Sequence, residues 1–315
     1  MNMSQNKSLS TQEVADMLFV SKSTIYNLIR SGELKSYKIG RKIRFTQDDV
    51  DAFISRSHFE QTSKPVSRVE VENTLFNPSQ TENAEILISG QDAVLDILAS
   101  SLRQNGVNAS RCYLSGFEGL LSLYQGKVDV VACHLYDSHS GQYNIPFVKL
   151  LMPGVRSTVI HIARRSQGFY VKKGNPKSIR SWEDLSRNDV TIINRRAGSG
   201  SRILLDGKLL ELGIPTSSVK GYDNIIPSHL TLASAIAGGE ADVGIGTERV
   251  SKKVRDLDFI PLITESFDLV VRTEFLLTDN GQKMMELLRS TAFRNDVAGL
   301  AGNDYLNLGH VVAEV

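Results

Sequence analysis

The chain has 315 residues, of which 41% are hydrophobic and 23% are charged, a balance typical of folded globular proteins. This length is too great for one ordinary domain and predicts two or three. The net charge of +1 conceals a basic block at residues 22–44, which favours an acidic partner, with nucleic acid first.

No apolar run approaches the roughly 18 residues that a membrane span needs, and the N-terminal segment MNMSQNKSLS lacks the apolar core of a signal peptide. The two cysteines, Cys112 and Cys133, form no metal-binding pattern such as C-x-x-C. We therefore expect reduced thiols in a cytoplasmic protein.

Residues 1–56 have the pattern of a small DNA-binding domain. Ser10 and Glu13 form a capping box at the start of a short helix, and Ser21 caps a second helix with an apolar stripe. Two short helices joined by a turn are typical of a helix-turn-helix unit. The alternative is a small helical domain whose basic face is merely solvated.

A β-hairpin wing is predicted by two short runs, residues 34–39 and 42–45, and a second capping box at 46–49 predicts a further helix. Side chains of the second helix and the wing can donate to phosphates and base edges. The expected DNA contacts are Lys22, Ser23, Thr24, Tyr26, Asn27, Arg30, Lys38, Arg41, Lys42 and Arg44.

The stretch 9–55 resembles the winged helix-turn-helix domain of the excisionase and MerR type. The phrases STIYNLIRSGEL and GRKIRFTQDDVDAFI carry this resemblance. Residues 57–83 are polar, contain two prolines and have no sustained period, so they predict a linker with one short strand at 69–71.

Residues 84–315 alternate short apolar runs with helical patterns, which predicts an α/β domain with a parallel sheet. The predicted strands are 86–88, 113–114, 128–132, 159–162, 168–171, 191–193, 219–222, 241–245, 260–263 and 269–271. The predicted helices include 93–102, 116–124, 230–237, 281–289 and 292–298. Two such sets, with the chain returning late, suggest two lobes joined by crossing strands.

The stretch 191–206, TIINRRAGSGSRILLD, is the strongest local signal for a ligand site. An apolar strand, a Gly/Ser turn and a helix leave free backbone N–H groups at the helix start, where an anion is favoured. Arg195, Arg196 and Arg202 add cationic donors. The same arginines could instead be solvated or bridge the two lobes.

The polar loops that follow other strands have two interpretations each. Their serines could donate hydroxyl groups to an oxyanion, or cap helices, and the two roles can coexist. Asp92 would repel an anion and is interpreted as a cap or positioning group. His134, Asp137 and His139 could be metal ligands, but their irregular spacing in a loop favours a hydrogen-bonding role for His134.

A second resemblance is carried by EILISGQD, GFEGLLSLYQGKVDVVACHLYD, RSQGFYVKKGNPKSIRSWEDL, INRRAGSGSRILLD and ADVGIGTE. These segments resemble the periplasmic-binding-protein-like domain of molybdate- and tungstate-sensing regulators, over nearly all of residues 84–315. The resemblance implies a type II bilobal fold that closes on a small oxyanion. With the loop chemistry it suggests ligand contacts from Ser89, Gly90, Gln91, Ser115, Gly116, His134, Arg195, Arg196, Gly198, Ser199, Gly200, Ser201, Arg202 and Tyr222.

The predicted fold is therefore multidomain, with a mainly α winged helix-turn-helix at 1–56 and a bilobal α/β binding domain at 84–315. The predicted function is a cytoplasmic transcriptional regulator that binds operator DNA as a homodimer and senses molybdate or tungstate, with no other cofactor and no metal site. Neither a P-loop nor a G-x-S-x-G elbow is present, so no enzymatic activity is expected. The alternatives are a regulator of a sulfate-like anion or organic acid, an excisionase-like architectural protein, and an enzyme of molybdenum metabolism.

Overall fold

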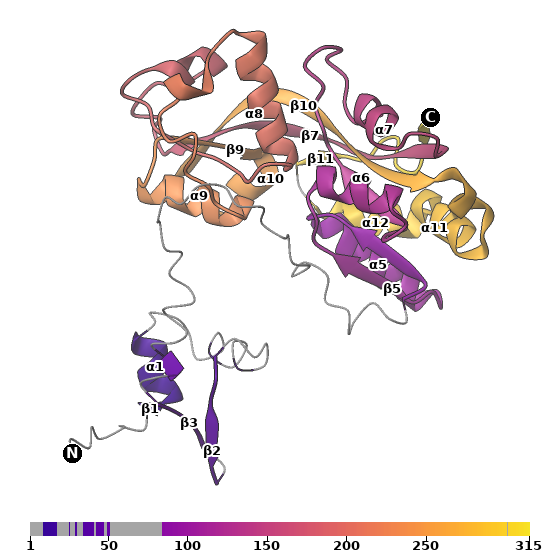
Figure 1. Ribbon diagram of the computed structural model, residues 1–315, viewed down its shortest axis with the longest axis horizontal. Coiled ribbons are helices and arrows are strands. Elements are labelled where there is room, and N and C mark those ends of the chain that lie inside the picture. Colours follow the sequence, from indigo (N-terminus) through magenta and orange to yellow (C-terminus); the bar gives the residue numbers. More distant parts are fainter. Residues whose placement is uncertain are drawn as a thin grey trace. The chain divides into compact units, whose positions relative to one another are not determined.

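The computed structural model describes residues 9–17, 25, 29, 34–40, 42–46, 49–50, 84–300 and 302–315. The chain divides into two compact units, residues 1–71 and 72–315, drawn in Figure 1. The predicted linker at 57–83 and its short strand lie outside the described residues.

The N-terminal unit contains β1 (Leu9–Ser10), α1 (Thr11–Met17), β2 (Tyr37–Ile39) and β3 (Lys42–Phe45). The strands form an antiparallel sheet in the order β1-β3-β2, so the predicted hairpin wing is confirmed. Both capping boxes are present: Glu13 accepts from the backbone N–H of Ser10 at 2.8 Å, and Asp49 from that of Thr46 at 3.0 Å. Among the described residues of this unit, the buried apolar side chains are Leu9, Val14, Ile25, Leu34, Phe45 and Val50.

Among the predicted DNA contacts, Lys38, Lys42 and Arg44 lie on the strands of the hairpin. The other predicted contacts lie outside the described residues: Lys22, Ser23, Thr24, Tyr26, Asn27, Arg30 and Arg41.

The C-terminal unit is built on a nine-stranded sheet whose main path runs β5-β4-β6-β10-β7-β9-β8. Two 16-residue strands, β7 (Ser157–Lys172) and β10 (Leu257–Arg272), pair antiparallel along their whole length. They cross between two lobes, which we define as lobe 1 (residues 84–163 and 266–315) and lobe 2 (residues 164–265). Figure 1 shows both strands passing from one lobe to the other.

Lobe 1 has parallel strands at its centre and helices on both faces. It contains β4 (Ile86–Ser89), α5 (Ala93–Gln104), β5 (Ala109–Cys112), α6 (Gly116–Tyr124), β6 (Val130–Cys133), α7 (Ile145–Leu151), η3 (Thr273–Leu277), α11 (Asp279–Arg289), α12 (Thr291–Ala298), β11 (Asn303–Asp304) and β12 (Val311–Glu314). One apolar core packs α5, α11 and α12 on the sheet, and a second packs α6 and α7 on its other face.

Lobe 2 repeats this arrangement on a smaller scale. It contains η1 (Trp182–Ser186), β8 (Ile192–Ile193), α8 (Gly200–Glu211), η2 (Thr216–Ser218), α9 (His229–Gly238), β9 (Val243–Thr247) and α10 (Glu248–Ser251). Helices α8 and α9 cover opposite faces through two separate apolar cores. The predicted multidomain fold with a two-lobed α/β domain is thus confirmed. The sheet is mixed rather than parallel as predicted, because the crossing strands β7 and β10 run antiparallel to their neighbours.

Several strand predictions differ from the structure in detail. The separate apolar runs at 159–162 and 168–171, and those at 260–263 and 269–271, belong to two continuous strands, because Arg165 and Glu265 between them are buried as an ion pair. The strand near 113–114 lies instead at Ala109–Cys112. Residues 219–222 form a turn after η2, not a strand.

Cys112 and Cys133 are both buried free thiols. None of the helices in the described part of the chain is long and apolar enough to cross a membrane.

Candidate functional site

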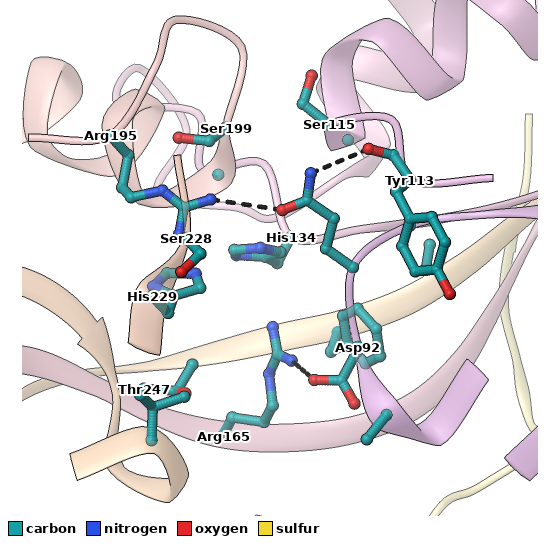
Figure 2. A pocket seen from close by; sticks show the side chains of 18 of the residues that line it. Asp92, Tyr113, Ser115, His134, Arg165, Arg195, Ser199, Ser228, His229 and Thr247 are labelled. Atoms are coloured by element: carbon teal, nitrogen blue, oxygen red, sulfur yellow. Dashed lines mark hydrogen bonds and ion pairs between the residues drawn. The ribbon is translucent and has the colours of Figure 1, made fainter. Parts of the chain in front are cut away.

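A cavity of about 370 Å³ lies between the two lobes. It is lined by the loops that follow β4, β5 and β6 in lobe 1, by the loops before α8 and α9 in lobe 2, and by the middle of the crossing strands. Figure 2 shows Arg195, Ser199, Ser228 and His229 on the lobe 2 side, facing Ser115 and Tyr113 of lobe 1. The cavity is the place where the polar loops of both lobes converge.

Four helices direct their N-termini at this cavity, and the N-cap residue of each lines it: Asp92 of α5, Ser115 of α6, Ser199 of α8 and Ser228 of α9. A helix N-terminus carries roughly half a positive charge and unpaired N–H groups, so it favours an anion. Each of these three serines accepts from a backbone N–H in the first turn of its own helix. The cap role expected as one alternative for Ser115 and Ser199 is thus confirmed, whereas the same alternative was wrong for Ser89, which ends β4, and for Ser201, which lies inside α8.

The two lobes differ in how this positive potential is balanced. Helices α5 and α6 of lobe 1 carry acidic residues, Asp96 and Glu118, in their first turns. Helices α8 and α9 of lobe 2 carry none. The electropositive half of the cavity is therefore the half formed by lobe 2.

Arg195 is the cation at the centre of that half. Only 2% of its surface is exposed, and its Nη2 donates to Oε1 of Gln91 at 3.4 Å. Its Nε and Nη1 have no hydrogen-bond partner in the described part of the chain. Burial, with a contribution from neighbouring Arg196, lowers the pKa of Arg195 to about 10, so it remains charged at neutral pH without a carboxylate beside it.

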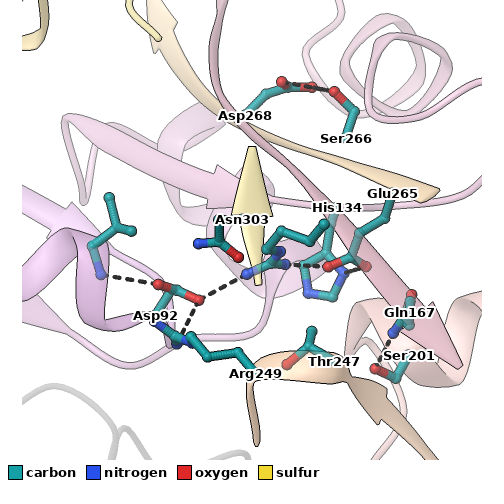
Figure 3. A network of polar contacts seen from close by, with 12 residues as sticks. Asp92, His134, Gln167, Ser201, Thr247, Arg249, Glu265, Ser266, Asp268 and Asn303 are labelled. Atoms are coloured by element: carbon teal, nitrogen blue, oxygen red, sulfur yellow. Dashed lines mark hydrogen bonds and ion pairs between the residues drawn. The ribbon is translucent and has the colours of Figure 1, made fainter. Parts of the chain in front are cut away.

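The other charges at the floor of the cavity balance one another (Figure 3). Asp92 receives Arg165 at 2.7 Å and Arg249 at 3.0 Å. Glu265 contacts the second amino group of Arg165 and lies 2.8 Å from Nδ1 of His134. Burial acts to raise the pKa of Glu265, but Arg165 and His134 more than offset it and the pKa is lowered. The two arginines and the two carboxylates of this network therefore neutralise one another and join the two lobes.

His229 follows the cap of α9 and lines the cavity next to this cationic surface. Burial, and then the nearby charge of Arg195, hold the pKa of His229 well below its usual value. Its ring is therefore neutral at physiological pH and can donate one hydrogen bond.

The structure brings eight of the fourteen predicted ligand residues to the cavity wall: Gly90, Gln91, Ser115, Gly116, His134, Arg195, Ser199 and Gly200. Six others do not line it: Ser89, Arg196, Gly198, Ser201, Arg202 and Tyr222. Their contacts in the structure explain where they point instead.

Ser89 is fully buried beneath its loop. Ser201 accepts from Gln167 at 2.6 Å, and Arg202 pairs with Asp206 at 3.0 Å and stacks on Tyr222.

Arg196 lies 3.4 Å from Glu118 of lobe 1 and so bridges the lobes, one of the two roles that the sequence left open. The backbone N–H of Phe117 also donates to the carbonyl of Gly198, at 3.4 Å. The two lobes are therefore already in contact beside the cavity.

Several cavity residues were not predicted, notably Tyr113, Arg165, Thr247, Arg249 and Phe267. A signal existed for Arg165, because a charged residue inside a long apolar stretch needs a buried partner. Thr247 is the last residue of β9 and Arg249 follows it, at the strand end where ligands of open α/β sheets bind. Asp92 was interpreted correctly as a cap, since it accepts from the N–H of Val94 at 2.9 Å.

Within the described ranges no group of three or more His, Cys, Asp or Glu side chains is placed to hold a metal ion. Asp137, a member of the alternative metal set, accepts instead from the Ser140 hydroxyl at 2.6 Å. Converging helix N-termini and an unpaired arginine make the site suited to binding an anion.

The fold and the cavity define the class: a DNA-binding helix-turn-helix domain joined to a bilobal binding domain of the periplasmic-binding-protein type. Residues 8–58 match a helix-turn-helix domain family, and residues 99–289 match the PBP superfamily domain. The chain belongs to the PBP superfamily domain family. Both kinds of domain are typically non-enzymatic, and together they point to a regulator that senses a small ligand.

The uncharacterized protein YvgK of Bacillus subtilis (strain 168) is 37% identical over 316 residues, which cover 99% of this chain and 100% of YvgK. An uncharacterized protein from the 5′ region of a 2Fe-2S ferredoxin gene of Clostridium pasteurianum is 37% identical over 113 residues, 36% of this chain and 100% of its own. Among solved structures, a candidate phosphate ABC transporter substrate-binding protein from Clostridium perfringens, with bound phosphate, has a TM-score of 0.52 at 16% identity. That match covers 70% of this chain and 99% of the other, and at this identity it shows the fold alone.

Proposed function

We propose that this protein is a cytoplasmic transcriptional regulator that binds operator DNA as a homodimer and responds to a small anion held between the lobes of its C-terminal unit. The helix-turn-helix supports the DNA half of this proposal, because such units commonly bind palindromic sites as dimers. The anion would bind the closed arrangement better than an open one and so shift the equilibrium between them.

One observation carries the anion assignment: Arg195 lies buried and charged at the cavity wall, and it pairs with no carboxylate of the described residues. Burying a cation without a counter-ion is costly, so a site built this way gains most from a ligand that brings a negative charge. The N-termini of α8 and α9 add hydrogen-bond donors, and Ser199 contributes a hydroxyl group beside them.

Molybdate and tungstate are the first candidate ligands. The sequence resembles sensors of these oxyanions, and the electropositive lobe 2 half of the site offers hydrogen-bond donors with no acidic residue in the first turns of α8 and α9. A small organic acid is the second candidate. The cavity of about 370 Å³ supports it, since that volume exceeds the needs of a single tetrahedral oxyanion.

Calorimetry with molybdate, tungstate, sulfate, phosphate and citrate tests the anion assignment directly. We expect saturable binding of at least one, and loss of that binding in Arg195→Gln. Arg187→Gln is the matched control, because this lobe 2 arginine pairs with Asp184 and Asp189 and does not line the cavity. Absence of binding by every anion to the folded protein, or equal losses in both variants, would contradict the proposal.

The regulatory half requires a separate measurement. A gel shift on the DNA upstream of the protein's own gene should show binding that changes when the bound anion is added. If the affinity for DNA stays unchanged up to a saturating concentration of the anion, the anion site does not regulate DNA binding.

A further inference from the structure

Arg195 is an exception among the arginines around the cavity. Arg165 and Arg249 contact Asp92, and Arg196 contacts Glu118. The side-chain contact of Arg195 is instead a neutral amide, that of Gln91. Because Gln91 belongs to lobe 1 and Arg195 to lobe 2, this hydrogen bond crosses the cleft.

The orientation of the Gln91 amide is fixed by its other partner. Its Nε2 donates to the backbone carbonyl of Tyr113 at 3.0 Å. A carbonyl can only accept, so the nitrogen must face Tyr113 and the oxygen is left to face Arg195. Gln91 therefore presents an acceptor without a charge to the guanidinium.

We propose that Gln91 is a positioning residue for the bound anion: it holds Arg195 from the opposite lobe by a neutral oxygen and leaves the charge of Arg195 to the ligand. The inference rests on the proposed anion site. It adds that the amide is required at this position for its lack of charge as well as for its hydrogen bond.

A glutamate of the same length would act in the opposite way. Its carboxylate would pair with Arg195 inside the cleft, relieve the cost of burying that cation, and compete with the incoming anion. The ligand-free protein would gain stability while its affinity for anions would fall. A variant that only damages packing would lower both.

The first experiment needs no ligand. The melting temperature of the full-length protein is measured for wild type, Gln91→Glu, Arg195→Gln and the double variant, which form a double-mutant cycle. A glutamate loses the donation to the Tyr113 carbonyl, but Gln91 is exposed at the cavity rim and this loss is the same with and without Arg195, so the cycle subtracts it. We expect Gln91→Glu to raise the melting temperature when Arg195 is present and to have no such effect in Arg195→Gln.

Gln282→Glu, on an exposed position of α11 away from the cavity, controls for a general effect of added negative charge. Equal shifts by Gln91→Glu in both backgrounds, or a lower melting temperature with Arg195 present, would overturn the role of Gln91.

The second experiment measures affinity for the anion among molybdate, tungstate, sulfate and phosphate that saturates the wild type. Gln91→Glu should bind it at least about tenfold more weakly, as an internal counter-ion requires. Gln91→Met, which removes the hydrogen bond without adding charge, should lose less. Equal affinity of Gln91→Glu and the wild type for the anion would refute the inference while leaving the anion site intact. Failure of the wild type to bind any of these anions would refute the proposed function, and the melting temperatures of the double-mutant cycle would then decide the role of Gln91.

Discussion

Asp92 and Arg249 lie 157 positions apart in the sequence and meet at 3.0 Å, one from each lobe. Asp92 is the N-cap of α5, and its carboxylate also accepts from Arg165 of the crossing strand β7. The buried carboxylate of Asp92 thus caps a helix, neutralises an arginine of a crossing strand and joins the two lobes. Its removal would leave two arginines without this partner.

Asp92→Ala should accordingly lower the free energy of unfolding of the C-terminal unit by about 3–5 kcal/mol, the usual cost of breaking a buried ion pair from one side. Urea unfolding monitored by the fluorescence of Trp182 measures it. Asp96→Ala is the control, because Asp96 also lines the cavity but has a 58% exposed side chain. Its pairing with Arg111 should contribute no more than about 1 kcal/mol. Similar decreases in the free energy of unfolding of the two variants would show that the ion pairs of Asp92 stabilise the fold no more than an exposed ion pair does.

Gly200 allows the lobes to approach each other. A Cβ at this position would lie 2.4 Å from Cε1 of His134 in the other lobe. Gly200→Ala should therefore keep the lobes apart and weaken anion binding by at least about tenfold, with an increased radius of gyration in X-ray scattering.

Gly238→Ala is the contrasting variant, because a Cβ there meets nothing within 4 Å at the end of α9. It should leave affinity unchanged and raise stability by up to about 1 kcal/mol. Normal anion affinity in Gly200→Ala would mean that the ligand binds without the interlobe contact seen in the structure.

The lowered pKa of His229 predicts that the folded protein loses stability on acidification. Burial and Arg195 hold its pKa well below the usual value near 6.5. The unfolded chain therefore takes up a proton below about pH 6.5 that the folded protein refuses, and stability falls as the pH decreases from there. His229→Gln should reduce the difference in urea midpoint between pH 7.5 and pH 5.5. His310→Gln, which changes an exposed histidine outside the cavity, should not.

The wing offers a test of DNA binding. Arg44 lies on β3 of the hairpin, and we expect it to contact a phosphate rather than a base. Arg44→Ala should weaken binding to specific and unrelated DNA by similar factors, and reduce the slope of log affinity against log salt by about 1. Loss confined to the specific site would instead assign Arg44 to base recognition.

The local signals in the sequence predicted much of this site. Serine followed by a helical pattern after an apolar run predicted the caps of α6 and α8, and Gly116 and Gly200 beside them line the cavity. Such signals depend on neighbouring residues only, which is why they could be interpreted without a structure. The two-lobed α/β fold followed from the same alternation of strands and helices.

Long-range pairing is what sequence reasoning missed. Arg165 and Glu265 interrupt apolar runs and so resemble turn residues, yet each is buried because the other lies beside it on the neighbouring strand. Strand β5 escaped prediction for a related reason: ASRC is an edge strand whose Arg111 pairs with Asp96, so its pattern is barely apolar. Periodicity carries no information on partners a hundred residues away.

The order of the two lobes along the polypeptide chain has a consequence for biosynthesis. Lobe 2 is one continuous stretch, whereas lobe 1 needs residues 84–163 and also 266–315, including β11 and β12, which pair with β7. During translation, the half of the cavity that carries Arg195 therefore has its whole polypeptide available before lobe 1 receives its remaining helices and strands. The loops of lobe 1 that face Arg195 are translated earlier still, so both walls of the cavity leave the ribosome before α11 and α12, which complete the apolar core behind the lobe 1 wall.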